Sequence, residues 1–195
     1  MLALSSSPRI SGNSDLLLDE FLHGIRDGSG ASDYSVEKVY LAELQIAACT
    51  QCDHCRQAGL CPLQDDMQPL YARLSDADAV VLASPIYFMA HCAQAKLLID
   101  RCQVFWARKY ILKQEFRPSD RPRRRGVFIA VGATHGPKVF AGAKLTVKWW
   151  LDSLEAEYWG DLLIEGVDGR GAIREHPTAL AQAYELGQRF CRLDS

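Results

Sequence analysis

The sequence predicts an α/β fold in which a mainly parallel, five-stranded sheet is covered by helices on both faces. Short apolar runs alternate along the chain with segments whose apolar residues recur at helical spacing, which is typical of successive strand–helix units. The length of 195 residues, with 48% hydrophobic and 24% charged side chains, excludes a disordered, collagen-like or coiled-coil chain. At this length we expect a single domain over residues 1–195.

The expected elements follow one another in regular order. Strands are expected at residues 1–5, 34–40, 79–84, 126–131 and 158–163, and helices at 14–26, 65–74, 93–101, 141–154 and 177–193. The second helix opens with Asp65 and has Gln68 three residues later, the pattern of a capping box. Five such units in a chain of this size suit a flavodoxin-like sheet of order 2-1-3-4-5. The Gly-x-Gly-x-x-Gly pattern of a Rossmann unit is absent after the first strand.

The loop after the first expected strand is rich in hydroxyl side chains and contains Arg9 and Gly12. It leads directly into the first expected helix, whose free backbone N–H groups and positive dipole end favour an anion. A guanidinium beside them can hold a phosphate through two hydrogen bonds. We interpret this loop as a phosphate site, and the alternative is an ordinary helix cap made by serine and asparagine.

A second loop begins where the third expected strand ends at Ser84. Open α/β sheets bind ligands at the carboxyl ends of their strands, and this loop places Ile86, Tyr87 and Phe88 there. Aromatic side chains at that edge can pack on a flat ring. The alternative is that the two aromatic side chains fill the core under the next helix.

Four of the seven cysteines have the spacing Cys-x2-Cys-x2-Cys-x5-Cys, namely Cys49, Cys52, Cys55 and Cys61. Thiolates are soft ligands that suit iron–sulfur clusters and zinc, and this spacing allows one loop to surround one cubane cluster. Structural zinc sites usually separate two cysteine pairs by a dozen or more residues. We therefore favour a [4Fe-4S] cluster held by residues 49–61, with zinc or no metal as the alternatives.

The other cysteines and the histidine within the cysteine loop are given structural roles. Cys92, Cys102 and Cys191 lie on or beside expected helices and are expected to be small buried side chains. His54, between two of the clustered cysteines, is expected to face solvent.

The formal net charge of −2 conceals an uneven distribution. Residues 1–100 carry 13 acidic and 6 basic side chains, whereas residues 101–125 carry 9 basic and 2 acidic ones. The proline-rich basic segment 117–125 is expected to be a solvated loop, a contact for the 2′-phosphate of NADPH, or a contact for an acidic electron-transfer partner. The small net charge argues against nucleic acid. Without a span of roughly 20 apolar residues or a secretory signal, we expect a cytoplasmic protein with no membrane partner.

These loops resemble those of a known family. The first loop resembles the phosphate loop of the NADPH-dependent FMN reductase family through Ser7-Pro8-Arg9 and Gly12-Asn13-Ser14. The second resembles the second flavin loop of that family, and the cysteine spacing is similar to that of the iron–sulfur flavoproteins. Similarity at residues 95–101, 131–132, 165–167 and 183–187 extends the resemblance over nearly the whole chain.

The resemblance implies an FMN site with three parts. The phosphate would be held by Ser7, Arg9, Asn13 and Ser14, the ribityl chain and isoalloxazine ring by Pro85, Ile86, Tyr87 and Phe88, and the pyrimidine side of the ring by Gly132, Ala133, Thr134 and His135. One departure is Ser6, which stands where the family usually has glycine. Its Cβ is expected to narrow the approach to the phosphate.

The resemblance also implies a flavin-dependent oxidoreductase that forms a dimer or tetramer of identical chains. It would pass electrons between NAD(P)H or a ferredoxin-like carrier and a quinone, an oxygen species or another small acceptor. Because the flavin carries the chemistry, no catalytic side chain is expected. The cysteine loop is expected at the same sheet edge as the phosphate loop. Two alternatives stay open: an electron carrier without turnover of its own, and a binding module with structural zinc.

Overall fold

The computed structural model describes residues 1–28, 35–115, 121 and 123–192. Its parallel strands have the order β2-β1-β3-β5-β6, which is the predicted order 2-1-3-4-5. They are Leu2–Ser5 (β1), Glu37–Tyr40 (β2), Ala79–Tyr87 (β3), Arg124–Gly132 (β5) and Ala156–Glu165 (β6). The prediction of five strands was wrong by one, because Ala90–His91 (β4) pairs antiparallel with the end of β3. A two-residue strand is too short to carry a periodic apolar pattern.

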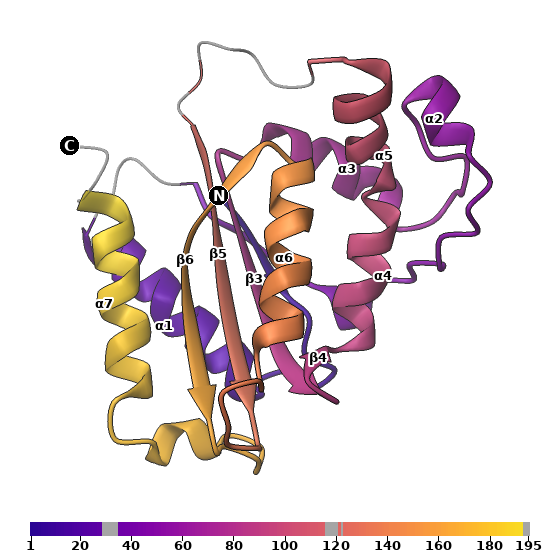
Figure 1. The fold of residues 1–195 in the computed structure, drawn as a ribbon. Coiled ribbons are helices and arrows are strands. Elements are labelled where there is room, and N and C mark those ends of the chain that lie inside the picture. Colours follow the sequence, from indigo (N-terminus) through magenta and orange to yellow (C-terminus); the bar gives the residue numbers. More distant parts are fainter. Residues whose placement is uncertain (29–34, 116–120, 122, 193–195) are drawn as a thin grey trace.

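Helices cover both faces of the sheet, as predicted (Figure 1). Asn13–Gly28 (α1) and Ala179–Arg192 (α7) pack on one face, and Met67–Asp76 (α3), Ala93–Arg101 (α4), Gln103–Trp106 (α5) and Ala141–Ser153 (α6) pack on the other. Alternate residues of each central strand enter the two cores, so Leu2 and Leu4 face α3 to α6 whereas Ala3 faces α1 and α7. Burial on both faces explains why the central strands are apolar without alternation.

Glycine permits the close approach of α1 and α7. A Cβ at Gly24 would lie 2.0 Å from the carbonyl oxygen of Tyr184, and a Cβ at Gly187 would lie 2.1 Å from that of Phe21. Any larger residue at either position would push the two helices apart. The last predicted helix residue, 193, and the first residue predicted for β2, 34, lie outside the described residues.

The connection between β2 and α3 differs most from prediction. It contains a short 3-10 turn, Leu41–Glu43 (η1), and a short helix, His54–Ala58 (α2), and α3 begins at Met67 rather than at residue 65. The predicted capping box was wrong, because Gln68 Nε2 does not reach back toward Asp65. It donates to the carbonyl oxygens of Cys61 and Leu63, at 2.9 and 2.6 Å. Gln68 therefore fastens the end of the cysteine loop.

The segment after α5 is also irregular. Ala107–Leu112 (η2) forms a π-helix, a rare conformation that often marks functional or strained positions. It directly follows α5 in the chain, with no break between the two helical segments. None of the helices in the described part of the chain is both long enough and apolar enough to cross a membrane.

Candidate functional site

A cavity of about 150 Å³ opens where the parallel strands end. Four segments that are distant in the sequence line it: Ser7, Arg9, Gly12, Asn13 and Ser14 after β1, Pro85, Ile86 and Tyr87 at the end of β3, Val131 and Ala133 around the end of β5, and Val167, Asp168 and Arg170 after β6. The strand β3 extends to Tyr87, so the prediction that it ends at Ser84 was wrong. Parallel topology brings the carboxyl ends of the strands to one edge and so assembles these segments. We call this cavity the strand-end cavity.

The N-terminus of α1 has the features of an anion site within this cavity. The Ser14 side chain is 2% exposed, and its hydroxyl has no hydrogen-bond partner among the described residues. An unpaired buried hydroxyl costs about 1–3 kcal/mol, and a phosphate oxygen would pair it. The neighbouring turn is too tight for a side chain, because a Cβ at Gly12 would lie 2.8 Å from the carbonyl oxygen of Arg9. The residues present therefore fit a phosphate.

Hydrogen bonds within the turn determine its shape. The hydroxyl of Ser7 accepts the backbone N–H of Arg9 at 3.1 Å and donates to the Arg9 carbonyl oxygen at 3.0 Å. Ser6 turns away from the cavity, because its hydroxyl donates to the carbonyl oxygen of Ala83 at 2.8 Å and is fully buried. The hydroxyl of Ser6 therefore does not enter the cavity, and the effect of its Cβ on the approach to the phosphate stays a prediction.

The loop after β6 is part of the site, and the sequence analysis missed it. Asn13 holds this loop with both ends of its amide: Nδ2 donates to the carbonyl oxygen of Gly169 at 2.9 Å, and Oδ1 accepts the N–H of Ile173 at 3.2 Å. Arg170 donates to the carbonyl oxygen of Ile10 at 2.8 Å and brings a second guanidinium to the cavity. The available signal was the glycine-rich segment 166–171 directly after a predicted strand.

The hairpin between β3 and β4 forms one rim of the strand-end cavity. Tyr87 lines the cavity and is 44% exposed, whereas Phe88 is fully exposed and is not among the lining residues. The alternative in which these aromatic side chains fill the core was therefore wrong. Phe88 and Met89 both have positive φ, at 52° and 63°, which gives the tight turn. The hairpin presents an uncovered apolar tip beside the cavity.

The third predicted loop, residues 132–135, supplies only one residue to the lining of the strand-end cavity. Ala133 lines the cavity, but Gly132, Thr134 and His135 do not. His135 is largely exposed and lies over Gly166, and its Nδ1 is 3.5 Å from a carboxylate oxygen of Glu165. The same oxygen accepts the N–H of Gly136 at 3.0 Å. This arrangement ties the third loop to the end of β6.

The four clustered cysteines line a second cavity of about 430 Å³, which we call the cysteine cavity. Arg101, Val104 and Trp106, from the end of α4 and from α5, form its opposite wall. Burial raises the pKa of the Cys55 thiol, and the three other clustered cysteines add to the increase through like charge. Among the described residues no three His, Cys, Asp or Glu side chains are gathered as metal ligands. The thiols share one cavity and are not drawn together to a point.

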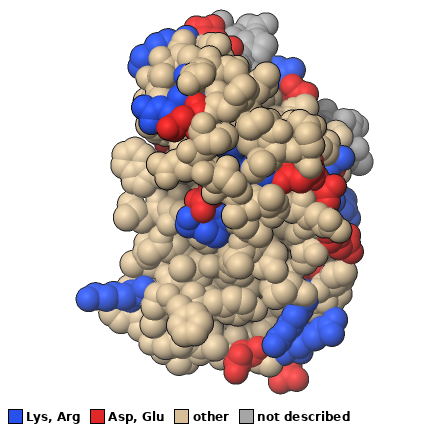
Figure 2. Space-filling view, turned by 90° about the vertical axis from the view of Figure 1, so that its right-hand side faces the viewer, with Lys and Arg blue, Asp and Glu red and all other residues tan. Residues whose placement is uncertain are grey.

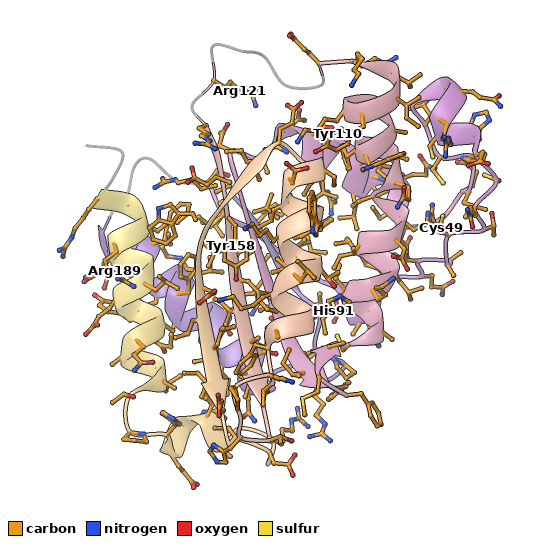
Figure 3. The ribbon with its side chains drawn as sticks, viewed as in Figure 1. Cys49, His91, Tyr110, Arg121, Tyr158 and Arg189 are labelled. Atoms are coloured by element: carbon orange, nitrogen blue, oxygen red, sulfur yellow. The ribbon has the colours of Figure 1, made fainter. Side chains whose placement is uncertain are left out.

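The cysteine cavity does not lie at the strand-end edge, contrary to expectation. Cys49 lies on the outer side of α4 and α5, whereas the strands end at the bottom of the view (Figure 3). The two cavities share no lining residue. The nine residues of α4 run from the hairpin to the cysteine cavity, a rise of about 13 Å at 1.5 Å per residue.

Arg124 and Arg125, in the described part of the basic segment, make contacts within the fold and line neither cavity. Arg124 is 1% exposed and donates to the carbonyl oxygens of Leu154 and Ser75. Arg125 donates to the carbonyl oxygen of Phe190 at 2.9 Å, and its guanidinium carbon lies 4.0 Å from the centre of the Phe190 ring. Residues 117–120 and 122 lie outside the described residues.

The described residues of this segment lie away from the strand-end cavity. Arg121 lies at the end where β5 begins, opposite the strand-end cavity (Figure 3). On the face that contains α2, α4 and α5, charged side chains of both signs are scattered in small groups over a mostly uncharged surface (Figure 2). Neither observation among the described residues supports a continuous basic docking stripe.

Two smaller expectations are confirmed. Cys92, Cys102 and Cys191 are buried, as expected. Burial raises the pKa of the Cys102 thiol to about 12. His54 is exposed, although it begins α2 rather than lying in an irregular loop.

Comparison with known proteins shows similarity to proteins named iron–sulfur flavoproteins. An iron–sulfur flavoprotein of Archaeoglobus fulgidus is 32% identical over 141 residues, which cover 72% of this chain and 58% of that protein. An iron–sulfur flavoprotein of Methanocaldococcus jannaschii is 35% identical over 101 residues, which cover 52% of this chain and 50% of that protein. The matches thus span about half the length of these curated relatives.

Similar solved structures support the fold. An NAD(P)H:quinone oxidoreductase from Methanothermobacter marburgensis has a TM-score of 0.71 at 18% identity, covering 97% of this chain and 94% of the other. An FMN-dependent NADH-azoreductase from Bacillus anthracis, solved with FMN, has a TM-score of 0.66 at 13% identity, covering 97% and 98%. Residues 1–150 match the family model described as NADPH-dependent FMN reductase. This chain therefore belongs to the NADPH-dependent FMN reductase family.

Proposed function

We propose that this protein is an FMN-dependent oxidoreductase whose strand-end cavity holds the FMN phosphate. The observation that carries the proposal is the buried, unpaired hydroxyl of Ser14 at the N-terminus of α1, beside a turn that only glycine permits at residue 12. In this assignment Ser14 and the backbone N–H groups of α1 bind the phosphate, and Arg9 neutralises it. Ser7 shapes the turn, and Asn13 holds the loop after β6 against it.

The ring of the flavin would lie beyond the cavity. A volume of about 150 Å³ is below the roughly 300–1,000 Å³ of typical small-molecule sites, so it suits the phosphate and part of the ribityl chain. Pro85, Ile86 and Tyr87 would line the path outward, and Phe88 would border the ring on one side. Ala133 and its neighbours Gly132, Thr134 and His135 would flank the other side. Family membership supports this arrangement.

A second copy of the chain would cover the exposed hairpin. Tyr87, Phe88 and Met89 are exposed together beside the cavity, and grouped exposed apolar side chains mark interaction surfaces. A homo-oligomer would bury them and shield the ring from water. Light scattering tests this, since Phe88→Ser should lower the oligomeric state with little change in the stability of each chain.

We further propose that the cysteine cavity holds a [4Fe-4S] cluster bound by Cys49, Cys52, Cys55 and Cys61. All four line one cavity, they have soft thiolate chemistry, and two relatives are named iron–sulfur flavoproteins. The cavity wall contains the cation Arg101, which suits a site with four thiolates.

When bound, FMN would supply the transfer of electrons, with NAD(P)H or a ferredoxin-like carrier as donor and a quinone, an oxygen species or another small molecule as acceptor. The chain itself would bind and orient the cofactor. The solved neighbours named as quinone oxidoreductase and azoreductase support small, flat acceptors.

Anaerobic purification tests both parts of the proposal. We expect flavin absorption that NADPH bleaches, together with about four iron and four acid-labile sulfide per chain. A colourless protein containing zinc would contradict the oxidoreductase. Flavin that reduced ferredoxin bleaches and NADPH does not would favour the electron carrier. The variant with all four clustered cysteines replaced by serine should lose iron and keep FMN.

A further inference from the structure

We propose that Arg101 is the positioning residue of the cysteine loop, holding both ends of the loop so that its four thiols face one cavity. The inference rests on the proposed cluster site and adds to it a residue outside the loop. Arg101 is the last residue of α4, and its side chain is completely buried. Burying a guanidinium is costly unless it is paired, so the groups that pair with Arg101 indicate its role.

The partners of Arg101 are the two ends of the cysteine loop. On the side that precedes Cys49, Nη1 donates to the carbonyl oxygen of Ala47 at 3.0 Å. On the side that follows Cys61, Nη2 lies 3.5 Å from the carbonyl oxygen of Leu63. One planar side chain thus joins two points that are 16 residues apart and lie on either side of all four cysteines.

Asp65 completes the clamp. Its carboxylate pairs with both terminal nitrogens of Arg101, with Oδ1 at 3.2 Å from Nη2. The same carboxylate accepts the backbone N–H of Ala47 at 2.9 Å. The ion pair therefore holds Ala47 by both its carbonyl oxygen, which accepts from Arg101, and its N–H, which donates to Asp65. A lysine at position 101 has a single ammonium group and could not make these bonds with the same planar geometry.

The guanidinium is also part of the cavity. Arg101 lines the cysteine cavity, and its buried Nε–H has no hydrogen-bond partner among the described residues. Tyr71 donates its hydroxyl to the carbonyl oxygen of Arg101 at 3.1 Å. The clamp is thus continuous with the wall of the cavity that the thiols line.

A second arginine from the same helical segment braces the middle of the loop. Arg108 Nε donates to the carbonyl oxygen of Gly59 at 2.7 Å, between Cys55 and Cys61. Gly59 has a φ of +67°, and a Cβ there would lie 3.0 Å from Gln114 Oε1. The segment from α4 to η2 therefore supports the loop at its base and at its middle.

The test uses Co²⁺ as a probe of the thiols in the full-length, metal-free protein. Arg101→Met should weaken Co²⁺ binding by about 10- to 100-fold, the usual effect of removing a residue that supports metal ligands. It should also lower the thiolate-to-cobalt absorption per bound metal, because fewer thiols converge. Asp65→Asn is a milder second variant with the same expected direction, and it decides the question if Arg101→Met does not fold. Arg101→Lys should restore binding only in part.

Arg124 supplies the matched control. It is a second buried arginine that donates to two backbone carbonyl oxygens, those of Leu154 and Ser75, neither of which belongs to the cysteine loop or lines its cavity. Arg124→Met should lower the thermal stability and leave the cobalt spectrum and affinity unchanged. Equal loss of Co²⁺ binding in both arginine variants would overturn the proposal, as would unchanged binding in Arg101→Met. A wild-type protein that binds no Co²⁺ through its thiols would instead contradict the cluster site itself.

Discussion

Ser14 offers a sharp test of the phosphate site. Replacing it by alanine should raise the stability of the FMN-free protein and lower its affinity for FMN. The Ser14 hydroxyl is buried without a partner among the described residues. Replacing it by alanine removes an unsatisfied polar group and introduces a better helix former near the start of α1. If Ser14 binds the FMN phosphate as proposed, the same change would remove a hydrogen bond to a charged oxygen in the complex.

The two effects can be estimated from their physical origin. Relief of an unpaired buried hydroxyl is worth about 1 kcal/mol, which raises Tm by about 2–4 °C for a chain of this size. A hydrogen bond to a charged group is worth about 1.5–3 kcal/mol, which corresponds to roughly a 10- to 150-fold weaker Kd for FMN. Stability and affinity should therefore move in opposite directions.

The assay is thermal unfolding of the FMN-free protein together with FMN titration by flavin fluorescence. Ser5→Ala is the matched control, since Ser5 is 1% exposed, has an equally unpaired hydroxyl and does not line the cavity. Both variants should keep or gain stability, and only Ser14→Ala should bind FMN more weakly. Unchanged FMN affinity in Ser14→Ala, or equal weakening in Ser5→Ala, would refute the placement of the phosphate.

Three further predictions follow from other residues. Gly12→Ala should abolish measurable FMN retention, because the new Cβ at 2.8 Å from the Arg9 carbonyl oxygen forces the turn open; retention of FMN on gel filtration would contradict this. Burial alone would raise the pKa of Asp65, but hydrogen bonds from Arg101 and from the backbone N–H groups of Ala47 and Met67 outweigh it and hold the pKa below its usual value. The resulting stability is present above about pH 4 and is lost as the pH falls through the folded-state pKa, so urea unfolding of Asp65→Asn should show a flatter acid dependence than wild type. Arg123→Ala should leave KM for NADPH within about twofold, because this exposed side chain pairs with Glu157 at the sheet end opposite the cavity; a large rise in KM would restore the basic segment as a cofactor contact.

Much of the strand-end cavity was predictable because strand ends are visible in the sequence. Ser7, Arg9, Asn13 and Ser14 directly follow an apolar run, and all four line the observed cavity. Arg170 was missed because its contribution depends on a hydrogen bond to Ile10 across the sheet edge. Backbone acceptors of this kind leave no trace in the amino-acid pattern.

The charge pattern was the least reliable guide. The sequence shows how many arginines stand at residues 121–125, but it does not show that Arg124 is buried against the ends of two helices. The role of Arg101 was also not predictable. In the sequence it is the last residue of an expected helix, and in the structure it donates to the carbonyl oxygens of Ala47 and Leu63, which belong to a distant loop. A cation is equally compatible with solvent, a ligand or a helix terminus until its neighbours are known.

The amino-acid pattern was enough to predict the α/β class, the order of the parallel strands, the segments at their carboxyl ends and the grouping of four cysteines. The class, the strand ends and the cysteine grouping depend on periodicity and spacing, which are local properties of the chain. The strand order followed from the number of strand–helix units, which suits a flavodoxin-like sheet. Three features became visible only in three dimensions: the loop after β6 lines the strand-end cavity, the cysteine cavity lies at the far end of α4, and the buried Arg101 bonds to both ends of the cysteine loop. Those outcomes depend on contacts between residues distant in the chain, where burial and backbone hydrogen bonding determine the role of each side chain.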